Sequence, residues 1–297
     1  MVSSNLNHPE LGRPMLLAVV SGLVIAAYWD SFVSMWALWQ TSDHRHGVLV
    51  FPIVAYLIWR LRHELAAKPI HADVRGLPLV AAVAALWTVA RLAGIQVFEH
   101  LAVLAMIPAA VLAFMGTSVV RRLQFPLLFI FLALPVSDAL VPYLMVITAE
   151  ISMALLDVSG IAVIREGQYF SLSGGNFVVA DVCSGNRYLV TGVMVSLLYG
   201  YLSYSNIGKR LALLAVTVVL LVFANGLRAY IVMAVASATD MQYLGGRDHI
   251  YFGWLLFGIV MMLILWIGSR FEDWPAEPRG ESCLLYTSDA ADEVVPV

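Results

Sequence analysis

The chain has 297 residues, of which 61% are hydrophobic and only 12% are charged, and its mean hydropathy is +0.85. Soluble domains are about half apolar and about one quarter charged, so the composition excludes an ordinary soluble protein and indicates an integral membrane protein. The net charge of −3, without a basic arm or stripe, argues against nucleic-acid binding.

Stretches of about 20 apolar residues predict about eight transmembrane helices. The first stretch has no small-residue cleavage site behind it, so we interpret it as a span and not as a signal peptide. We expect segment 141–158 to be an interfacial or re-entrant helix, because Glu150 and Asp157 are costly at the bilayer centre. The predicted spans are 14–33, 47–62, 77–96, 101–119, 123–140, 186–204, 210–235 and 251–269.

The helical pattern stops between residues 160 and 182. Two short β-prone segments, 170–172 and 176–180, flank the glycines at 174–175, which predicts a β-hairpin. The hairpin would deliver Cys183 to the start of the next span, where the free N–H groups of a helix N-terminus favour a thiolate. The expected fold class is therefore an all-α polytopic membrane protein with a short β-hairpin and an interfacial helix on one face, which the charges below predict to be the outer face.

Charges sort the loops into two sets. One set is rich in lysine and arginine and is therefore predicted to be cytoplasmic, with both termini on that side. Counting spans then places Cys183, Arg228 and His249 together on the outer face. The basic set holds Arg60, Arg62, Lys68, Arg75, Arg121, Arg122, Lys209, Arg210 and Arg270, and the opposite set holds Asp43, Glu99, Asp138, Glu166, Asp181 and Asp240.

Cys183, Arg228 and His249 are the candidate catalytic residues, because thiol, guanidinium and imidazole are the nucleophile, oxyanion stabiliser and general base of a cysteine peptidase. Taken singly, each has a simpler explanation: a packing cysteine, a snorkelling arginine and a hydrogen-bonded histidine. An outward-facing arginine runs against the charge bias, however, and all three share one face. Ser184 and Gly185 would let the backbone approach a substrate carbonyl closely.

Other polar residues are candidates for supporting roles. Asn225 lies one turn before the arginine and could orient its guanidinium. Asp248 precedes the histidine, but adjacent residues on a helix rarely face each other. Asp181 and Asp240 are equally good candidates for orienting the imidazole.

We expect neither a metal nor a cofactor. The segment Asp43-His44-Arg45-His46 contains a His-x-His pair, but no third ligand is evident in the sequence. This segment is better interpreted as a polar outer loop near the substrate entrance. The sequence contains no glycine-rich phosphate loop, dinucleotide fingerprint or HExxH motif.

Three motifs occur in order: VADVCSG at 179–185 with RYL at 187–189, NGLR at 225–228, and DH at 248–249 with GW at 253–254. Weaker signals are HG at 46–47, LIWR at 57–60, Gly160 and EG at 166–167. With these motifs the chain resembles an exosortase, a bacterial multi-pass membrane cysteine transpeptidase, and most closely the exosortase A branch. The resemblance covers roughly residues 15 to 275, and Asn186 departs from the family, which commonly has an aliphatic residue there.

The resemblance implies processing of exported proteins that carry a C-terminal Pro-Glu-Pro sorting signal, followed by a hydrophobic span and a basic tail. Cys183 would form an acyl-enzyme, His249 would act as base and then acid, and Arg228 would hold the oxyanion or thiolate. An amine or hydroxyl acceptor of unknown identity would resolve the thioester. The family is associated with exopolysaccharide production in Gram-negative bacteria, which implies a location in the inner membrane with the site facing the periplasm.

Three alternatives stay open from the sequence. A non-enzymatic transporter or polysaccharide-export component would carry ionisable or helix-breaking residues at mid-span, and few are present. An intramembrane hydrolase would use the same three residues with water as the acceptor. A metal-dependent protease has only the His-x-His pair in its favour.

We expect residues 1–275 to form the transmembrane domain and residues 276–297 to be a non-native or disordered tail. The segment 283–293 resembles a translated sequencing adapter and is left out of the fold argument. Cys183 is then the only native cysteine, and no disulfide framework is indicated.

Overall fold

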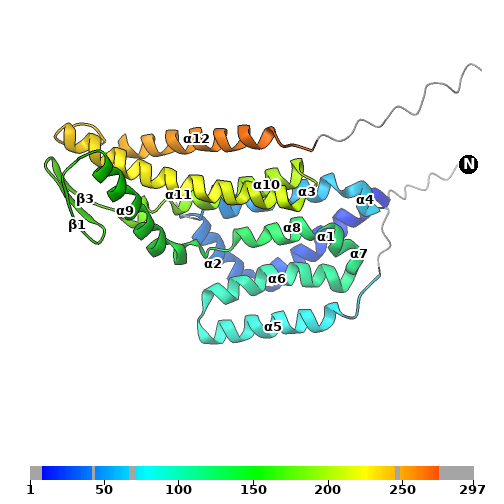
Figure 1. The fold of residues 1–297 in the computed structure, drawn as a ribbon. Coiled ribbons are helices and arrows are strands. Elements are labelled where there is room, and N and C mark those ends of the chain that lie inside the picture. The colour runs from blue at the N-terminus through cyan, green and yellow to red at the C-terminus, as the bar shows by residue number, and fades with distance from the viewer. Residues whose placement is uncertain (1–8, 42–43, 67–70, 245–247, 274–297) are drawn as a thin grey trace, which may run out of the picture.

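The computed structural model describes residues 9–41, 44–66, 71–244 and 248–273. Most of the long helices run side by side in roughly one direction, with the small sheet and helix α9 at one end (Figure 1). The expected tail 276–297, together with Asp43 and Lys68, lies outside the described residues.

The N-terminal half is a helical bundle with its own apolar core. Trp39, Met35, Leu104 and Met115 are fully buried there, and the Trp39 indole Nε1 donates to the Ala133 carbonyl at 2.8 Å. The elements of this half are α1 (Pro9–Ala27), α2 (Trp29–Trp39), α3 (His46–Arg60), α4 (Arg62–Ala66), α5 (Gly76–Ala93), α6 (Gln96–Met115), α7 (Thr117–Arg122), α8 (Gln124–Phe129) and the 3-10 helix η1 (Ile130–Ala133).

The C-terminal half carries the candidate site. A stack of Phe125 on Tyr201, with ring centroids 3.8 Å apart, joins it to the first half. Its elements are η2 (Ser137–Leu140), α9 (Val141–Val158), β1 (Val163–Glu166), β2 (Tyr169–Leu172), β3 (Gly175–Val178), η3 (Asp181–Cys183), α10 (Asn186–Ser203), α11 (Ile207–Ala238) and α12 (Asp248–Ser269).

In the described part of the chain, fewer helices than the eight predicted have the length and composition of a membrane span. Among the described residues, five helices are long and apolar enough to cross a bilayer, or six if α1 and α2 form one broken span. The predicted span 14–33 is interrupted at Tyr28, where α1 and α2 meet at 93°. The predicted span 123–140 breaks into α8, η1 and η2, and α3 has only 15 residues. The class of a multi-pass, all-α membrane protein is confirmed.

Helix α9 has the length and hydropathy of a span, which the interfacial prediction did not anticipate. It lies obliquely at the sheet end of the bundle (Figure 1) and packs on α11, where the Ser152 hydroxyl donates to the Gly226 carbonyl at 3.1 Å. Its two acids are exposed, and Glu150 accepts from Arg165 of β1 at 2.9 Å. Strand β1 therefore supplies Arg165 as a counterion for Glu150, and this pairing is not visible in the sequence of the helix alone.

The sheet has three antiparallel strands in the order β1-β2-β3. The predicted hairpin corresponds to β2 and β3, with Phe170 opposite Phe177 and a glycine turn between the strands. Strand β1 was missed, because its four residues include two charged side chains and alternate too briefly to stand out. Phe170 and Leu172 face inward and are buried in a core shared with α9 and α11.

The length of helix α11 determines where the candidate site lies relative to a bilayer. Its 32 residues span about 48 Å, whereas the hydrocarbon core of a bilayer is about 30 Å thick. Arg228 lies about 31 Å from the start of the helix. The last ten residues of α11 therefore extend beyond a bilayer-length segment and support α9 and the sheet.

Candidate active site

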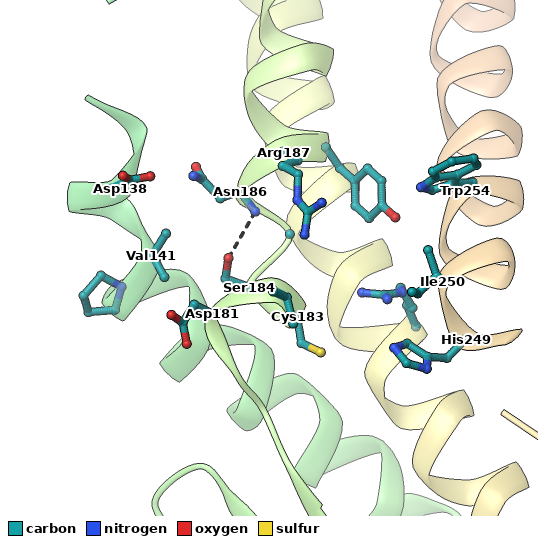
Figure 2. A pocket seen from close by; sticks show the side chains of 15 residues that line it. Asp138, Val141, Asp181, Cys183, Ser184, Asn186, Arg187, His249, Ile250 and Trp254 are labelled. Atoms are coloured by element: carbon teal, nitrogen blue, oxygen red, sulfur yellow. Dashed lines mark hydrogen bonds between the residues drawn. The ribbon is translucent and has the colours of Figure 1, made fainter. Parts of the chain in front are cut away.

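Cys183, Arg228 and His249 line one cavity of about 550 Å³, called here the main cavity. They come from η3, α11 and α12, which are separated in sequence by 45 and 21 residues. The Cys183 sulfur points toward the His249 ring (Figure 2), and Arg228 lines the same cavity. The structure thus brings the three candidate catalytic residues together.

The backbone holds Cys183 in place at the entrance to α10. Its N–H donates to the Ala180 carbonyl at 2.8 Å, which closes the single turn of η3. The thiol is free and half-buried, and α10 begins three residues later at Asn186. Cys183 therefore lies between the hairpin and the N-terminus of α10, as the sequence predicts, and the 3-10 turn η3 separates it from the strand.

Gly185 is required by its surroundings. It adopts φ +79°, and a Cβ at this position would lie 2.5 Å from Cγ of Asn225. The close approach made possible by this glycine is therefore to Asn225, whereas the sequence suggested a substrate carbonyl. The neighbouring Ser184 is buried, and its hydroxyl accepts from the Asn186 N–H at 3.3 Å.

Asn225 holds the cysteine backbone. Its Nδ2 donates to the Cys183 carbonyl at 2.8 Å and to the Thr148 hydroxyl of α9 at 2.9 Å. The expected role of orienting Arg228 is thus replaced by a link between α9, α11 and η3. Thr148 was missed, because nothing in the sequence connects a threonine of α9 with a residue 77 positions later.

Arg228 is buried between α10 and α12. Only 7% of it is exposed, and its Nε has no hydrogen-bond partner among the described residues. The guanidinium carbon lies 5.9 Å from the ring centroid of Tyr188, a cation–π distance. Gly253 makes room for this arrangement, since a Cβ there would be 2.6 Å from Arg228 Nε. Tyr188 and Gly253 lie within the quoted motifs but had no assigned role.

His249 is the second residue of α12, and three acids are candidates for orienting its ring. The Asp248 carboxylate accepts from the Leu244 N–H and so ties Leu244 to the first turn of the helix. Asp181 lies on the far side of the cysteine from the imidazole (Figure 2). Asp240 is exposed and has φ +49°. The role of these acids in orienting the imidazole stays a prediction.

The far rim of the main cavity is polar. Asp138 lies 3.4 Å from Nε2 of the buried His44, so the His-x-His segment reaches the cavity through this carboxylate. Asn186, the departure from the family, donates from Nδ2 to the Ser137 hydroxyl at 3.0 Å and joins α10 to η2. Within the described ranges, no cluster of three or more His, Cys, Asp or Glu side chains could hold a metal ion.

Taken together, the fold and the cavity describe a multi-pass membrane protein with a candidate site built around a thiol, a guanidinium and an imidazole. The sequence model of the transmembrane exosortase family matches residues 38–266, which include all three groups, and the chain belongs to this family. No curated protein and no solved structure matches the chain.

Proposed function

We propose that this exosortase is a membrane cysteine transpeptidase with Cys183 as nucleophile, His249 as general base and acid, and Arg228 as the anion-stabilising group. The observation that supports this assignment is the convergence of the three residues, from three separate elements, on one cavity. A half-buried thiol beside a buried, hydrogen-bond-deficient guanidinium is a favourable place for a thiolate or an oxyanion.

In the acylation step, His249 takes the proton of Cys183, and the sulfur attacks the scissile carbonyl carbon. The carbonyl oxygen becomes an oxyanion that Arg228 stabilises. The C–N bond then breaks, His249 returns the proton to the leaving amine, and a thioester remains on the cysteine. The leaving amine carries away the C-terminal part of the substrate.

In the transfer step, an amine or hydroxyl acceptor attacks the thioester while His249 takes its proton. The C–S bond breaks, and the thiolate is regenerated and reprotonated. Water in place of the acceptor would make the same site a hydrolase. The two outcomes differ in the product, because hydrolysis in ¹⁸O-labelled water puts one ¹⁸O atom into the new C-terminal carboxylate and transfer puts in none.

The substrates proposed from family resemblance are exported proteins with a C-terminal Pro-Glu-Pro signal, a hydrophobic span and a basic tail, and the pathway is exopolysaccharide production. A bilayer-anchored tail would present its cut point near the membrane surface. Arg228 lies about one hydrocarbon thickness from the start of α11, which is the depth such a substrate requires. Membership of the exosortase A branch stays a prediction.

The proposed location is the bacterial inner membrane, with the site facing the periplasm and both termini in the cytoplasm. The described basic loop residues support this orientation, because they cluster at the end of the bundle opposite the sheet, around α4 and α7 (Figure 1). An excess of lysine and arginine is typical of cytoplasmic loops.

The test is processing of a co-expressed exported reporter with such a signal, measured by the mass of its C-terminal fragment. Cys183→Ala and His249→Ala should leave the reporter uncleaved, and Cys183→Ser should be nearly as damaged, because a hydroxyl is far harder to deprotonate than a thiol. Cys283→Ser, which removes the other thiol of the chain, is the matched control and should process normally. Wild-type cleavage by Cys183→Ala would overturn the proposal.

A further inference from the structure

A second cavity of about 240 Å³ adjoins the main cavity, and Cys183, Arg228 and His249 line both. The lining of the main cavity includes the polar groups Asp138 and Arg187. Apart from the three shared residues, the lining of the second cavity is entirely apolar: Phe177, Val178, Val179, Ala229, Val232, Met233, Met241 and Leu244. The three candidate catalytic groups therefore stand between a polar and an apolar compartment.

The two cavities lie on opposite sides of the candidate catalytic residues along the bundle. Helix α11 runs antiparallel to α10 and α12, its neighbours in the chain, and reaches the second cavity with Val232 and Met233, after Arg228. The main cavity is lined instead by Tyr188 and Trp254, which follow the starts of α10 and α12 and lie deeper in the bundle. The second cavity is thus on the side away from the bundle, next to the sheet.

The second cavity borders the free edge of the sheet. Strand β3 is an edge strand, because the order is β1-β2-β3. Three consecutive residues, Phe177, Val178 and Val179, line the cavity. Val179 follows the last residue of β3, whereas Phe177 and Val178 belong to it. Because the side chains of neighbouring strand residues point to opposite faces, the joint lining by Phe177 and Val178 indicates that the cavity meets β3 at its edge.

The pairing pattern turns backbone groups toward this edge. Val179 donates its N–H to the Gln168 carbonyl at 3.0 Å, so its peptide groups face β2. In an antiparallel ladder the next residue points the opposite way, which directs the peptide groups of Val178 and Asn176 to the open side. The Val178 carbonyl accepts from the Ala180 N–H at 3.1 Å, so among the described residues the Val178 N–H is the donor that this strand end offers on its open side, where Val178 lines the second cavity.

We infer that the part of the substrate on the acyl side of the cut binds in extended form along the free edge of β3, with an apolar side chain in the second cavity. Edge strands are templates for an added peptide strand, in which main-chain hydrogen bonds give affinity and side-chain pockets give specificity. This inference rests on the proposed function. It assigns the membrane-anchored leaving part to the main cavity and keeps the acylated part beside Cys183 after cleavage.

A filled-cavity variant tests the side-chain subsite. Val232→Phe places a larger side chain in the second cavity, whereas Val235→Phe, one turn further along α11, adds the same group to a residue outside the cavity lining. We expect Val232→Phe to lower cleavage at least tenfold for a reporter with a bulky apolar residue beside the cut. Glycine at that reporter position should restore most of the rate, and the Val235→Phe control should match the wild type.

Labelling of Cys183 by a small maleimide shows whether the Val232→Phe site is still assembled and should proceed as in the wild type. Unimpaired cleavage by Val232→Phe, or a loss that glycine in the reporter does not relieve, would overturn the subsite. A wild-type enzyme that leaves every reporter intact would instead overturn the proposed function. The two failures are therefore distinguishable.

Disulfide trapping tests the strand geometry in a Cys183→Ala, Cys283→Ser background. Val178→Cys is combined with single cysteines placed along the reporter on the acyl side of the cut. An added strand predicts crosslinks at alternate reporter positions, because side chains of a strand alternate. Crosslinks at consecutive positions, or no crosslink at any position, would contradict the inference.

Discussion

Arg228 carries a full positive charge to a position where only 7% of the residue is exposed. The Tyr188 ring offsets part of the desolvation through its π face, while Nε has no hydrogen-bond partner in the described part of the chain. A buried cation that lacks a hydrogen-bond partner is stabilised strongly when an anion binds beside it, because the anion compensates for the lost hydration. In the proposed chemistry that anion is the thiolate or the oxyanion.

Arg228→Lys is expected to lower the processing rate by about 100-fold or more while leaving the protein folded. The ammonium is a point charge and cannot reproduce the planar donor fork, and loss of one oxyanion donor typically costs about 10²–10³ in rate. Reporter cleavage over time measures the effect. Arg270→Lys, at the opposite end of α12, is the control, and equal rates for the two variants would remove Arg228 from the site.

Asn225 shows how one residue can belong to a motif for a reason other than the expected one. Its position one turn before Arg228 favoured an orienting role, but its amide donates to the Cys183 carbonyl and to Thr148. The hydrogen bond to Cys183 ties the nucleophile to α11, the helix that also carries the guanidinium. Asn225 therefore positions the cysteine and does not contact the arginine through its donor.

At the scale of the elements, the site depends on how closely α12 approaches α11. A Cβ at Gly253 would lie 2.6 Å from Arg228 Nε and 2.8 Å from the Tyr188 hydroxyl. The Tyr188 ring stacks on Phe257 of the same helix, with centroids 4.9 Å apart, so it has little freedom to retreat. The glycine of the GW motif thus has a steric role in placing the guanidinium.

Gly253→Ala should lower reporter cleavage by about tenfold or more, because the added methyl displaces the guanidinium from the cavity. Gly258→Ala is the matched control on the same helix, since its Cβ would meet nothing within 4 Å, and alanine raises helix propensity by up to about 1 kcal/mol. Thermal unfolding in detergent should show both variants folded. Wild-type cleavage by Gly253→Ala would contradict the steric role.

The sheet and α9 form a support for the site that extends beyond the bilayer-length part of the bundle. Glu150 of α9 pairs with Arg165 of β1, whose guanidinium lies 5.5 Å from the Phe170 ring centroid. Phe170 in turn belongs to the core that contacts Cys183. The strands, the oblique helix and the nucleophile therefore pack as one unit on the end of α11.

For the whole molecule, the described basic loop residues of the set predicted to be cytoplasmic lie at the end opposite the candidate site (Figure 1). Arg122 pairs with Glu64 across α7 and α4, and Lys209 pairs with Asp273 where the chain leaves α12. The hydrogen bonds of Asp273 with Lys209 and Ser205 hold its pKa below the usual range. These ion pairs join helix ends on the side proposed to face the cytoplasm.

The proposed orientation predicts opposite labelling of the two ends in intact cells. In a Cys183→Ala, Cys283→Ser background, Ser171→Cys on the exposed face of the sheet should react with a membrane-impermeant maleimide added outside, once the outer membrane is permeabilised. Val74→Cys, exposed beside Arg75 at the other end, should react only after lysis. The reverse pattern would invert the orientation and place the site in the cytoplasm.

The sequence by itself determined that this is a membrane protein, because only long apolar segments can cross the hydrocarbon core of a bilayer as helices. The positions of most helices followed from the same apolar segments. It also placed the hairpin, through its glycine turn, and singled out Cys183, Arg228 and His249 as candidates on one face. These features depend on local composition and on the periodicity of neighbouring residues.

Only the tertiary structure decided the features that depend on contacts between distant segments. The 93° bend after α1, the break after α8, strand β1 and the packing of α9 on α11 are set by residues far apart in the chain. The partner of Asn225 lies 77 positions away, and the clearance at Gly253 depends on two other helices. Such contacts leave no periodic signal in a single sequence, so the two cavities around Cys183 became visible only in three dimensions.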